Sequence, residues 1–219
     1  MGEIDKRVRI AKRVAQELHD GDIVNLGIGM PTLVANYLPD EVSVILHSEN
    51  GFLGIGPEPL AELTDKDLVN AGGKPVTIQK NGCCFDSAMS FAIIRGGHID
   101  VTVLGALEVD ERGNLANWMV PGKRISGMGG AMDLVVGAKK IIIAMEHTNK
   151  DGSPKIVTEC SLPLTAQGEV DLIVTEIAVI AVYPDGLHLL EIAENTTLEN
   201  VVAATGAKLL FAEGTIGRF

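Results

Sequence analysis

Aromatic residues, cysteines and long apolar runs are scarce in this sequence. Aromatic side chains make up 4% of the 219 residues, whereas 46% are hydrophobic, so the core must consist mainly of Val, Ile, Leu and Ala. The three cysteines include the adjacent pair Cys83 and Cys84, and an odd number leaves a free thiol, which is typical of a reducing compartment. The start of the chain has no apolar segment typical of a signal peptide, and no apolar run is long enough to span a bilayer. We therefore expect a cytoplasmic protein without a membrane partner.

Positive charge is also in short supply, and the motifs of several enzyme classes are missing. The formal net charge of −11 argues against nucleic acid as a partner, because its recognition depends on Lys and Arg at the phosphates. The segment GIGMPT has Thr32 where a dinucleotide-binding loop has its third glycine, and the sequence contains neither a P-loop nor a G-x-S-x-G elbow. The histidines are scattered, without H-E-x-x-H or C-x-x-C spacing, so we expect no metal.

Short runs of branched aliphatic residues, separated by glycines, carry the main structural signal. Four examples are VSVILH (42–47), KIIIAME (140–146), LIVTE (172–176) and AVIAVY (178–183). Such runs are typical of strands that helices cover on both faces. Strands and helices alternate over the first two thirds, and strands follow one another closely near the end. We therefore predict one α/β domain over residues 1–219, with a mixed, mainly parallel sheet flanked by helices.

Capping and helix-breaking residues predict four helix boundaries. The first helix should end at Asp20-Gly21, and a second should run over 31–38. A third should run from an Asp86 cap to Gly96-Gly97, and a fourth should lie at about 197–204. In the last of these, Thr196 and Glu199 should form a capping box. Residues 57–74 show no clear periodicity, so we expect mostly loop there.

One carboxylate lies where an α/β sheet would present it to a ligand. Glu49 follows the strand VSVILH (42–47) in a tight S-E-N-G turn, and ligands bind outside the carboxyl ends of such strands. Gly51, Gly54 and Gly56 leave the nearby backbone open to close approach. However, Ser-Glu-Asn-Gly is also ordinary turn chemistry, and a surface glutamate is unremarkable. On these residues alone, the ordinary turn is the better interpretation.

Several separate motifs, in order and over nearly the whole chain, point further. The sequence resembles the family I coenzyme A transferases that act on acetoacetate and other 3-oxo acids, and in particular their B (beta) subunits. The resemblance lies in NLGIGMPTLVANYLP (25–39), HSENGFLGIGP (47–57), NAGG (70–73), FDSAMSFAIIRGGHID (85–100), LGALEVDERGNLANWMVPGKRISGMGGAMDLV (104–135) and LPLTA (162–166).

The resemblance implies a mechanism and a set of catalytic residues. Glu49 is the nucleophile, and coenzyme A is a substrate that becomes covalently attached as a glutamyl-CoA thioester in a ping-pong reaction. No metal or permanently bound cofactor is expected. The amide of Gly130, next to Gly129 at the start of a helix, should stabilise the oxyanion. Asn25 should orient Glu49 or donate to the oxyanion, with a purely structural role as the alternative.

The resemblance also suggests contacts for coenzyme A. The candidates are Gly27, Gly29, Asn50, Gly51, Lys74, Trp118, Lys123, Arg124 and Gly129. The cations would meet the phosphates of coenzyme A. Some relatives place a lysine directly after N-A-G, where this sequence has Gly73, so the assignment to Lys74 stays open. Trp118 lines the acyl or pantetheine channel or belongs to the core, and we assign His47 no role.

The implied assembly needs a second chain. The family's alpha (A) subunit would complete the site, and two A and two B chains would form a heterotetramer. The acids would be short-chain, with acetoacetate as one partner and acetate, butyrate or succinate as the other. The alternatives are an acyl-CoA hydrolase on the same scaffold and a non-catalytic regulatory or binding subunit. The intact S-E-N-G and G-M-G-G-A-M segments favour catalysis over the last of these.

Overall fold

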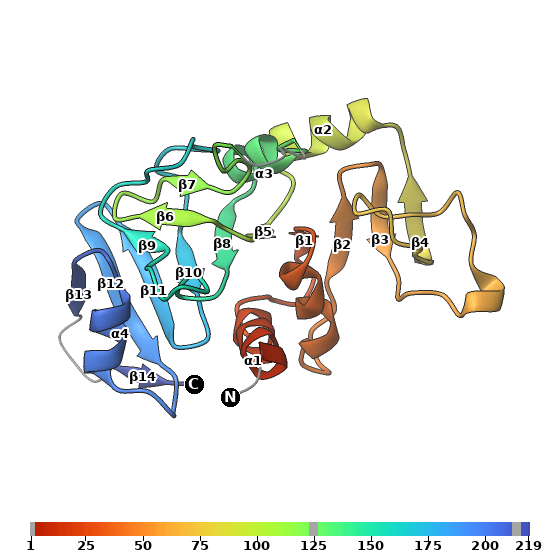
Figure 1. Cartoon of the computed structure of the whole chain (residues 1–219). Helices are drawn as coiled ribbons and strands as arrows, with labels where there is room; N and C mark the ends of the chain where they lie inside the picture. The colour runs from red at the N-terminus through yellow and green to blue at the C-terminus, as the bar shows by residue number, and fades with distance from the viewer. Residues whose placement is uncertain (1–2, 123–126, 212–215) are drawn as a thin grey trace.

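The structure, a computed structural model, describes residues 3–122, 127–211 and 216–219 (Figure 1). Its helices are α1 (Glu3–Ala15), α2 (Ser87–Arg95), α3 (Ala131–Gly137) and α4 (Leu198–Ala204), with 3-10 helices η1 (Met30–Tyr37) and η2 (Ala61–Leu63). Its strands are β1 (Ile23–Leu26), β2 (Ile45–Ser48), β3 (Phe52–Ile55), β4 (Ile78–Cys84), β5 (Val101–Leu104), β6 (Glu108–Asp110), β7 (Leu115–Ala116), β8 (Lys140–Ala144), β9 (Ile156–Val157), β10 (Leu172–Val174), β11 (Ala178–Tyr183), β12 (Gly186–Ile192), β13 (Leu209–Phe211) and β14 (Gly217–Arg218).

Most of the strands belong to one sheet of eleven (Figure 1). At its centre β10, β8, β5, β1 and β2 lie side by side and parallel. Antiparallel strands extend both sides: β3 and β4 next to β2, and β11 and β12 next to β10. Beyond them, β13 and β14 pair with β12 in parallel, and a separate sheet has the order β7, β6, β9. The predicted α/β fold with a mixed, mainly parallel sheet is confirmed.

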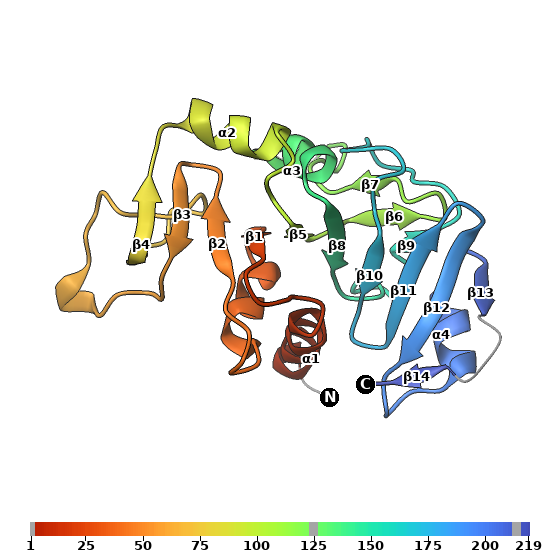
Figure 2. The ribbon, with the colours of Figure 1, turned by 180° about the vertical axis from the view of Figure 1, so that it is seen from behind.

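The central strands are buried on both faces, which explains their unbroken apolar runs. In β8, Ile141 and Ile143 pack into one core cluster, whereas Ile142 and Ala144 pack into the other, as the two-residue period of a strand requires. Helix α1 and η1 cover the second cluster, with Ile10, Val14 and Val34 fully buried there. The small sheet, α3 and α4 cover the first, through Leu115, Val135 and Val201. Figure 2 shows the same arrangement from behind.

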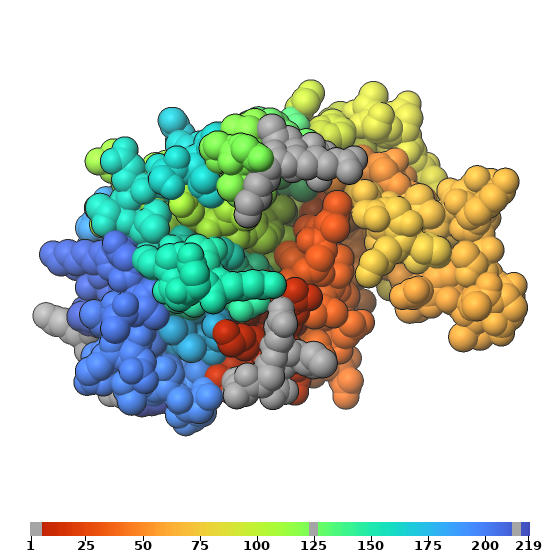
Figure 3. All heavy atoms as spheres, viewed as in Figure 1, coloured from red at the N-terminus to blue at the C-terminus, as the bar shows by residue number. Residues whose placement is uncertain are grey.

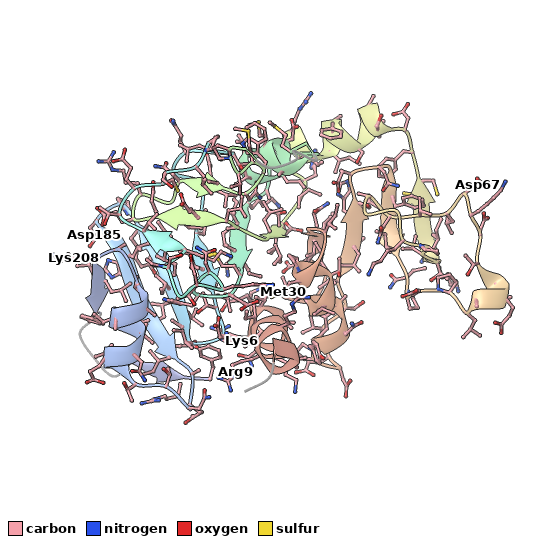
Figure 4. All side chains as sticks on the ribbon, viewed as in Figure 1. Lys6, Arg9, Met30, Asp67, Asp185 and Lys208 are labelled. Carbon is pink, nitrogen blue, oxygen red and sulfur yellow. The ribbon has the colours of Figure 1, made fainter. Side chains whose placement is uncertain are left out.

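Residues 52–84 form a wing that extends away from the body of the molecule (Figure 2). In Figure 4, Asp67 marks the far end of this wing, and Asp185 lies at the opposite side of the molecule. Phe52 and Val76 are its buried apolar side chains, whereas Leu60 and Leu63 are 64% and 71% exposed. The wing therefore has little core of its own.

Several element boundaries differ from those predicted. The first helix ends at Ala15 rather than at Asp20-Gly21, because residues 16–18 bond to carbonyls three positions back and tighten the last turn. The helix predicted over 31–38 is a 3-10 helix over residues 30–37. The last helix is capped by Thr197, whose hydroxyl accepts from the amide of Asn200, so the predicted Thr196 cap is wrong by one residue. The Asp86 cap and the end at Gly96 are confirmed.

The strands around the wing were predicted least well. Neither β3, which follows the S-E-N-G turn, nor β4 has a counterpart among the predicted strands. Cys83 and Cys84 lie on β4 and are exposed. Residues 57–74 are mostly loop as predicted, apart from the single turn of η2. Within the described ranges, no helix is both long enough and apolar enough to cross a membrane.

Candidate active site

Glu49 lies in the tight turn that joins β2 to β3. The turn is closed by the amide of Gly51, which donates to the carbonyl of Ser48 at 3.0 Å. Gly51 has φ +122°, and a side chain there would overlap the carbonyl of Phe85, so only glycine fits. The carboxylate is half-buried, at the carboxyl end of a parallel strand. This is the position that the sequence predicted for it.

The side chain of Glu49 lies against the backbone of Gly130, although the two residues are far apart in the sequence. A Cβ atom on Gly130 would be 3.3 Å from Cγ and 3.5 Å from Cβ of Glu49. Gly130 is the buried residue that immediately precedes α3, so the predicted helix start is confirmed. Gly129 before it has φ +54° and open space where a side chain would be. The structure thus brings together two of the predicted catalytic residues.

The 70–73 loop of the wing lies beside the catalytic turn. The amide of Ala71 donates to the hydroxyl of Ser48 at 3.0 Å, and the side-chain amide of Asn50 donates to the carbonyl of Val69 at 2.7 Å. The backbone amide of Lys74 donates to the side chain of Asn70, and the Lys74 side chain is exposed. Asn50 therefore links the turn to this loop, and Lys74 follows the loop directly.

A buried series of hydrogen bonds joins the end of β2 to β1 and α2. Nδ2 of Asn25, on β1, lies 3.3 Å from the carbonyl oxygen of His47 and 3.1 Å from its Nδ1. Because a carbonyl oxygen can only accept, the amide group of Asn25 must face His47, and Nδ1 is then an acceptor. The proton of His47 is therefore on Nε2, which donates to the hydroxyl of Ser90 on α2 at 3.0 Å. Burial lowers the pKa of His47 to about 4, which keeps the ring neutral as these hydrogen bonds require.

These hydrogen bonds bear on the roles predicted for Asn25. The Nδ2 atom of Asn25 has both of its hydrogen-bond contacts with His47, which favours a positioning role over donation to an oxyanion. Its Oδ1 atom is buried and has no hydrogen-bond partner among the described residues. The prediction that assigned no role to His47 missed this contact, since its partners Asn25 and Ser90 lie 22 and 43 residues away in the sequence. No sequence motif signals such a pairing.

Three of the remaining predicted residues, Gly27, Gly29 and Trp118, have local structural contacts or conformations of their own. Gly27 is explained by packing, because its amide donates to the carbonyl of Val103 and a Cβ would lie 3.0 Å from that oxygen. Gly29 has φ +94° and immediately precedes η1, with open space beside it. Trp118 is half-buried, and its indole N–H donates to the carbonyl of Leu164 at 3.3 Å. Lys123 and Arg124 lie outside the described residues. In the described ranges, no cluster of three His, Cys, Asp or Glu side chains could hold a metal ion.

Comparison with known proteins identifies the family. Residues 7–217 match the coenzyme A transferase family. The chain belongs to this family. It is 60% identical over 205 residues to the beta subunit of the acetate CoA-transferase of Escherichia coli K12, with 94% of each chain covered. It is 52% identical over 212 residues to the B subunit of a probable succinyl-CoA:3-ketoacid coenzyme A transferase of Bacillus subtilis, covering 97% of this chain and 98% of that one.

A solved structure agrees with these relatives. The acyl-CoA transferase YdiF apoenzyme from Escherichia coli O157:H7 superposes with a TM-score of 0.77 at 25% identity, over 97% of this chain. This chain spans 42% of that longer protein. The resemblance to coenzyme A transferases of the B type, predicted from the sequence, is confirmed. The chain is an enzyme subunit that takes part in the transfer of coenzyme A between carboxylic acids.

Proposed function

We propose that residues 1–219 act as one B-type unit, in which Glu49 is the nucleophile for coenzyme A transfer between short-chain carboxylic acids. The supporting observation is the contact between the Glu49 side chain and the backbone of Gly130. The carboxylate therefore lies beside the residue that immediately precedes α3. A backbone N–H group at such a position can stabilise a developing oxyanion. The acids we infer are a 3-oxo acid, such as acetoacetate, and acetate, butyrate or succinate.

In the proposed reaction, one carboxylate replaces another at each step. The Glu49 carboxylate attacks the thioester carbonyl carbon, the C–S bond breaks, and the coenzyme A thiolate leaves, which gives a mixed anhydride. The thiolate then attacks the glutamyl carbonyl carbon and expels the first acid as its carboxylate. The product is a glutamyl-CoA thioester. The acceptor acid reacts through the same steps in reverse and leaves as its coenzyme A thioester, which frees Glu49.

The residues around Glu49 suit this chemistry. Both tetrahedral intermediates carry an oxyanion, which the Gly130 amide would stabilise. The buried chain of Asn25, His47 and Ser90 would hold the end of β2, and with it the catalytic turn, in one position. The reacting carbonyl group stays activated, as a thioester or as an anhydride, at every step, so the reaction needs no ATP.

The proposed enzyme works with a second chain in the cytoplasm. The relatives with 60% and 52% identity are named as beta and B subunits, which supports an alpha (A) partner. We infer a heterotetramer of two A and two B chains, with coenzyme A as substrate and covalent intermediate. The candidate coenzyme A contacts of this chain are Asn50 and Lys74 beside the turn, together with Lys123 and Arg124.

Steady-state kinetics of the assembled pair would test the proposal. With acetoacetyl-CoA as donor, we expect parallel double-reciprocal plots when acetate is varied, as a ping-pong reaction requires. Glu49→Gln should abolish turnover, and Glu49→Asp should reduce it strongly because the attacking oxygen is withdrawn. Coenzyme A release that does not depend on the acid would instead indicate a hydrolase. Unchanged turnover in Glu49→Gln would support a non-catalytic role for this chain.

A further inference from the structure

A cavity lies at the same edge of the sheet as Glu49. It has a volume of about 260 Å³ and opens at the carboxyl ends of β1, β5 and β8, where Ile28, Ala106 and Met145 line it. Figure 3 shows the surface hollowed between the segment around residue 150 and the segment around residue 28. Met30, another lining residue, lies near the middle of the molecule in Figure 4. Ligands of open α/β sheets bind at such strand ends.

The rim of this cavity is positively charged, although the protein as a whole is strongly negative. Arg7, Lys150 and Lys155 line it, against the single carboxylate of Glu146. That carboxylate is itself 3.6 Å from the ammonium of Lys6. The excess of cations contrasts with a formal net charge of −11 for the chain. Attraction of an anion is therefore a local property of this cavity and does not follow from the overall charge.

Lys155 is the most unusual of these cations. Its side chain is half-buried, and burial lowers its pKa. In the described part of the chain it forms no ion pair, whereas the neighbouring Lys6 contacts Glu146 and Glu176. The charges of Glu146 and Glu176 act in the opposite direction but offset only part of the cost of burying this ammonium group, and an anionic ligand would offset more of it.

The mouth of the cavity lies close to the 70–73 loop, which bonds to the catalytic turn. Ile28 lies at its mouth, 69% exposed, and its side chain is 3.6 Å from the position of a Cβ atom on Gly72. Gly72 belongs to the 70–73 loop, whose Ala71 bonds to Ser48 immediately before Glu49. Ile28 and the 70–73 loop therefore lie between the cavity and the catalytic turn.

We propose that this cavity is an anion-binding subsite, in which Lys155 and Lys150 hold an anionic group of a substrate. The apolar walls of the cavity would contact the part of the substrate next to that group. The inference rests on the proposed function, since the substrates are those of coenzyme A transfer. Two substrates carry a suitable anion: coenzyme A through its phosphates, and the carboxylic acid through its carboxylate. At about 260 Å³ the cavity is near the lower end of the usual range for small-molecule sites, so it holds part of coenzyme A or one small acid.

The test uses the assembled pair with Lys155→Gln, Lys150→Gln and, as a matched control, Lys208→Gln. Lys208 is exposed and lies at the far side of the main sheet (Figure 4). Lys150 is also exposed, so its substitution should leave the thermal unfolding temperature unchanged. The measured quantities are KM for acetoacetyl-CoA, for acetoacetyl-pantetheine, which lacks all the phosphates, and for acetate.

The two sources of the anion predict different results. If the phosphates of coenzyme A bind here, KM for acetoacetyl-CoA rises about tenfold in Lys155→Gln, while the KM values for acetoacetyl-pantetheine and acetate stay unchanged. If the carboxylate of the acid binds here, KM for acetate rises and the other two stay unchanged. In both cases kcat is retained, and Lys150→Gln shows a smaller shift of the same kind.

Two results would overturn the subsite. The first is that no KM differs from that of Lys208→Gln. The second is that either variant fails to assemble with the A subunit, because the cavity would then receive the partner chain. Both are distinct from a failure of the proposed function, in which the unmodified pair forms no covalent intermediate on Glu49.

Discussion

At the residue scale, the account depends on what surrounds Glu49. The S-E-N-G turn and its place after a strand were predictable, because turn residues and strand ends are local signals. The contact with Gly130 was expected only through the family resemblance, since 81 residues separate the two along the chain. The chain of Asn25, His47 and Ser90 was not foreseen, because a buried polar network is defined by packing and carries no sequence pattern.

Gly130→Ala should slow the reaction without unfolding the protein. Gly130 has φ −84° and ψ 5°, which alanine tolerates, so the main effect is a methyl group 3.3 Å from Cγ of Glu49. Displacement of the carboxylate and the oxyanion donor should reduce kcat by roughly 100-fold. The check is kcat of the assembled pair, together with a thermal unfolding temperature that stays within a few degrees of the original. Full activity would show that this contact does not matter for catalysis.

The two buried histidines should make stability depend on pH. Burial lowers the pKa of His47 and of His147 to about 4, compared with about 6.5 in the unfolded chain. The unfolded state then binds more protons between these values, so the free energy of unfolding should fall as the pH drops from about 6.5 towards 4. Each histidine should contribute roughly 1 to 2 kcal/mol to the loss between pH 7 and pH 5.

Denaturant unfolding at several pH values would measure this loss. His47→Gln keeps a polar side chain but cannot titrate, so its stability should depend less steeply on pH than that of the original protein. An equal slope would mean that His47 is not neutral in the folded state.

At the element scale, helices and central strands were predictable and their edges were not. Continuous apolar runs are typical of strands that are buried on both faces. The central strands β8, with the sequence KIIIA, and β5, with the sequence VTVL, are examples. The strand β4 reads IQKNGCC and is mostly exposed, so it lacks any strand period. It forms because it pairs with β3, where Gly54 allows close approach to Gly82 across a register shift. Because more than twenty residues separate β3 from β4, their pairing leaves no local signal in the sequence.

The attachment of α1 depends on a buried arginine, which its sequence does not reveal. Arg13 on this helix is only 6% exposed and donates through Nε and Nη2 to both carboxylate oxygens of Glu191 on β12, each at 2.7 Å. It also donates to Glu17 at 2.8 Å. Glu17 in turn accepts from Lys140 of β8 at 2.7 Å. The helix is thus joined to two strands by charge-assisted bonds.

Arg13→Gln should therefore destabilise the fold. It leaves Glu191 without its partner in a largely buried place, and the loss of one member of such a pair costs about 3 kcal/mol. Chemical denaturation would measure the change, with Arg112→Gln, at an exposed position, as the control. If both variants unfolded at the same denaturant concentration, the pair would contribute little to stability.

At the scale of the whole molecule, the parallel centre and the closely spaced strands near the C-terminus follow from the order of apolar runs, so the fold class was predictable. The shape of the wing was not, because residues 52–84 bury few of their own side chains and expose Leu60 and Leu63. The catalytic turn and the cavity lie on one edge of the sheet, beside that wing. A site at such an edge, with half-buried Glu49, is consistent with completion by a second chain.

The purified chain alone should accordingly show less than about 1% of the transferase activity of the assembled pair, because part of the oxyanion and substrate site would be missing. The measurement is acetoacetyl-CoA turnover with acetate, before and after addition of separately purified A subunit. Size-exclusion chromatography with light scattering would give the stoichiometry, for which we expect two A and two B chains. Comparable activity without the A subunit would contradict the shared site.

The central claim, that Glu49 carries coenzyme A, is tested most directly by trapping the intermediate. The assembled pair would be incubated with acetoacetyl-CoA in the absence of an acceptor acid, digested, and studied by peptide mass spectrometry. The account predicts an added coenzyme A on the peptide that contains Glu49, which disappears on addition of acetate and is absent from Glu49→Gln. An adduct on a different residue, or one that persists in Glu49→Gln, would contradict it.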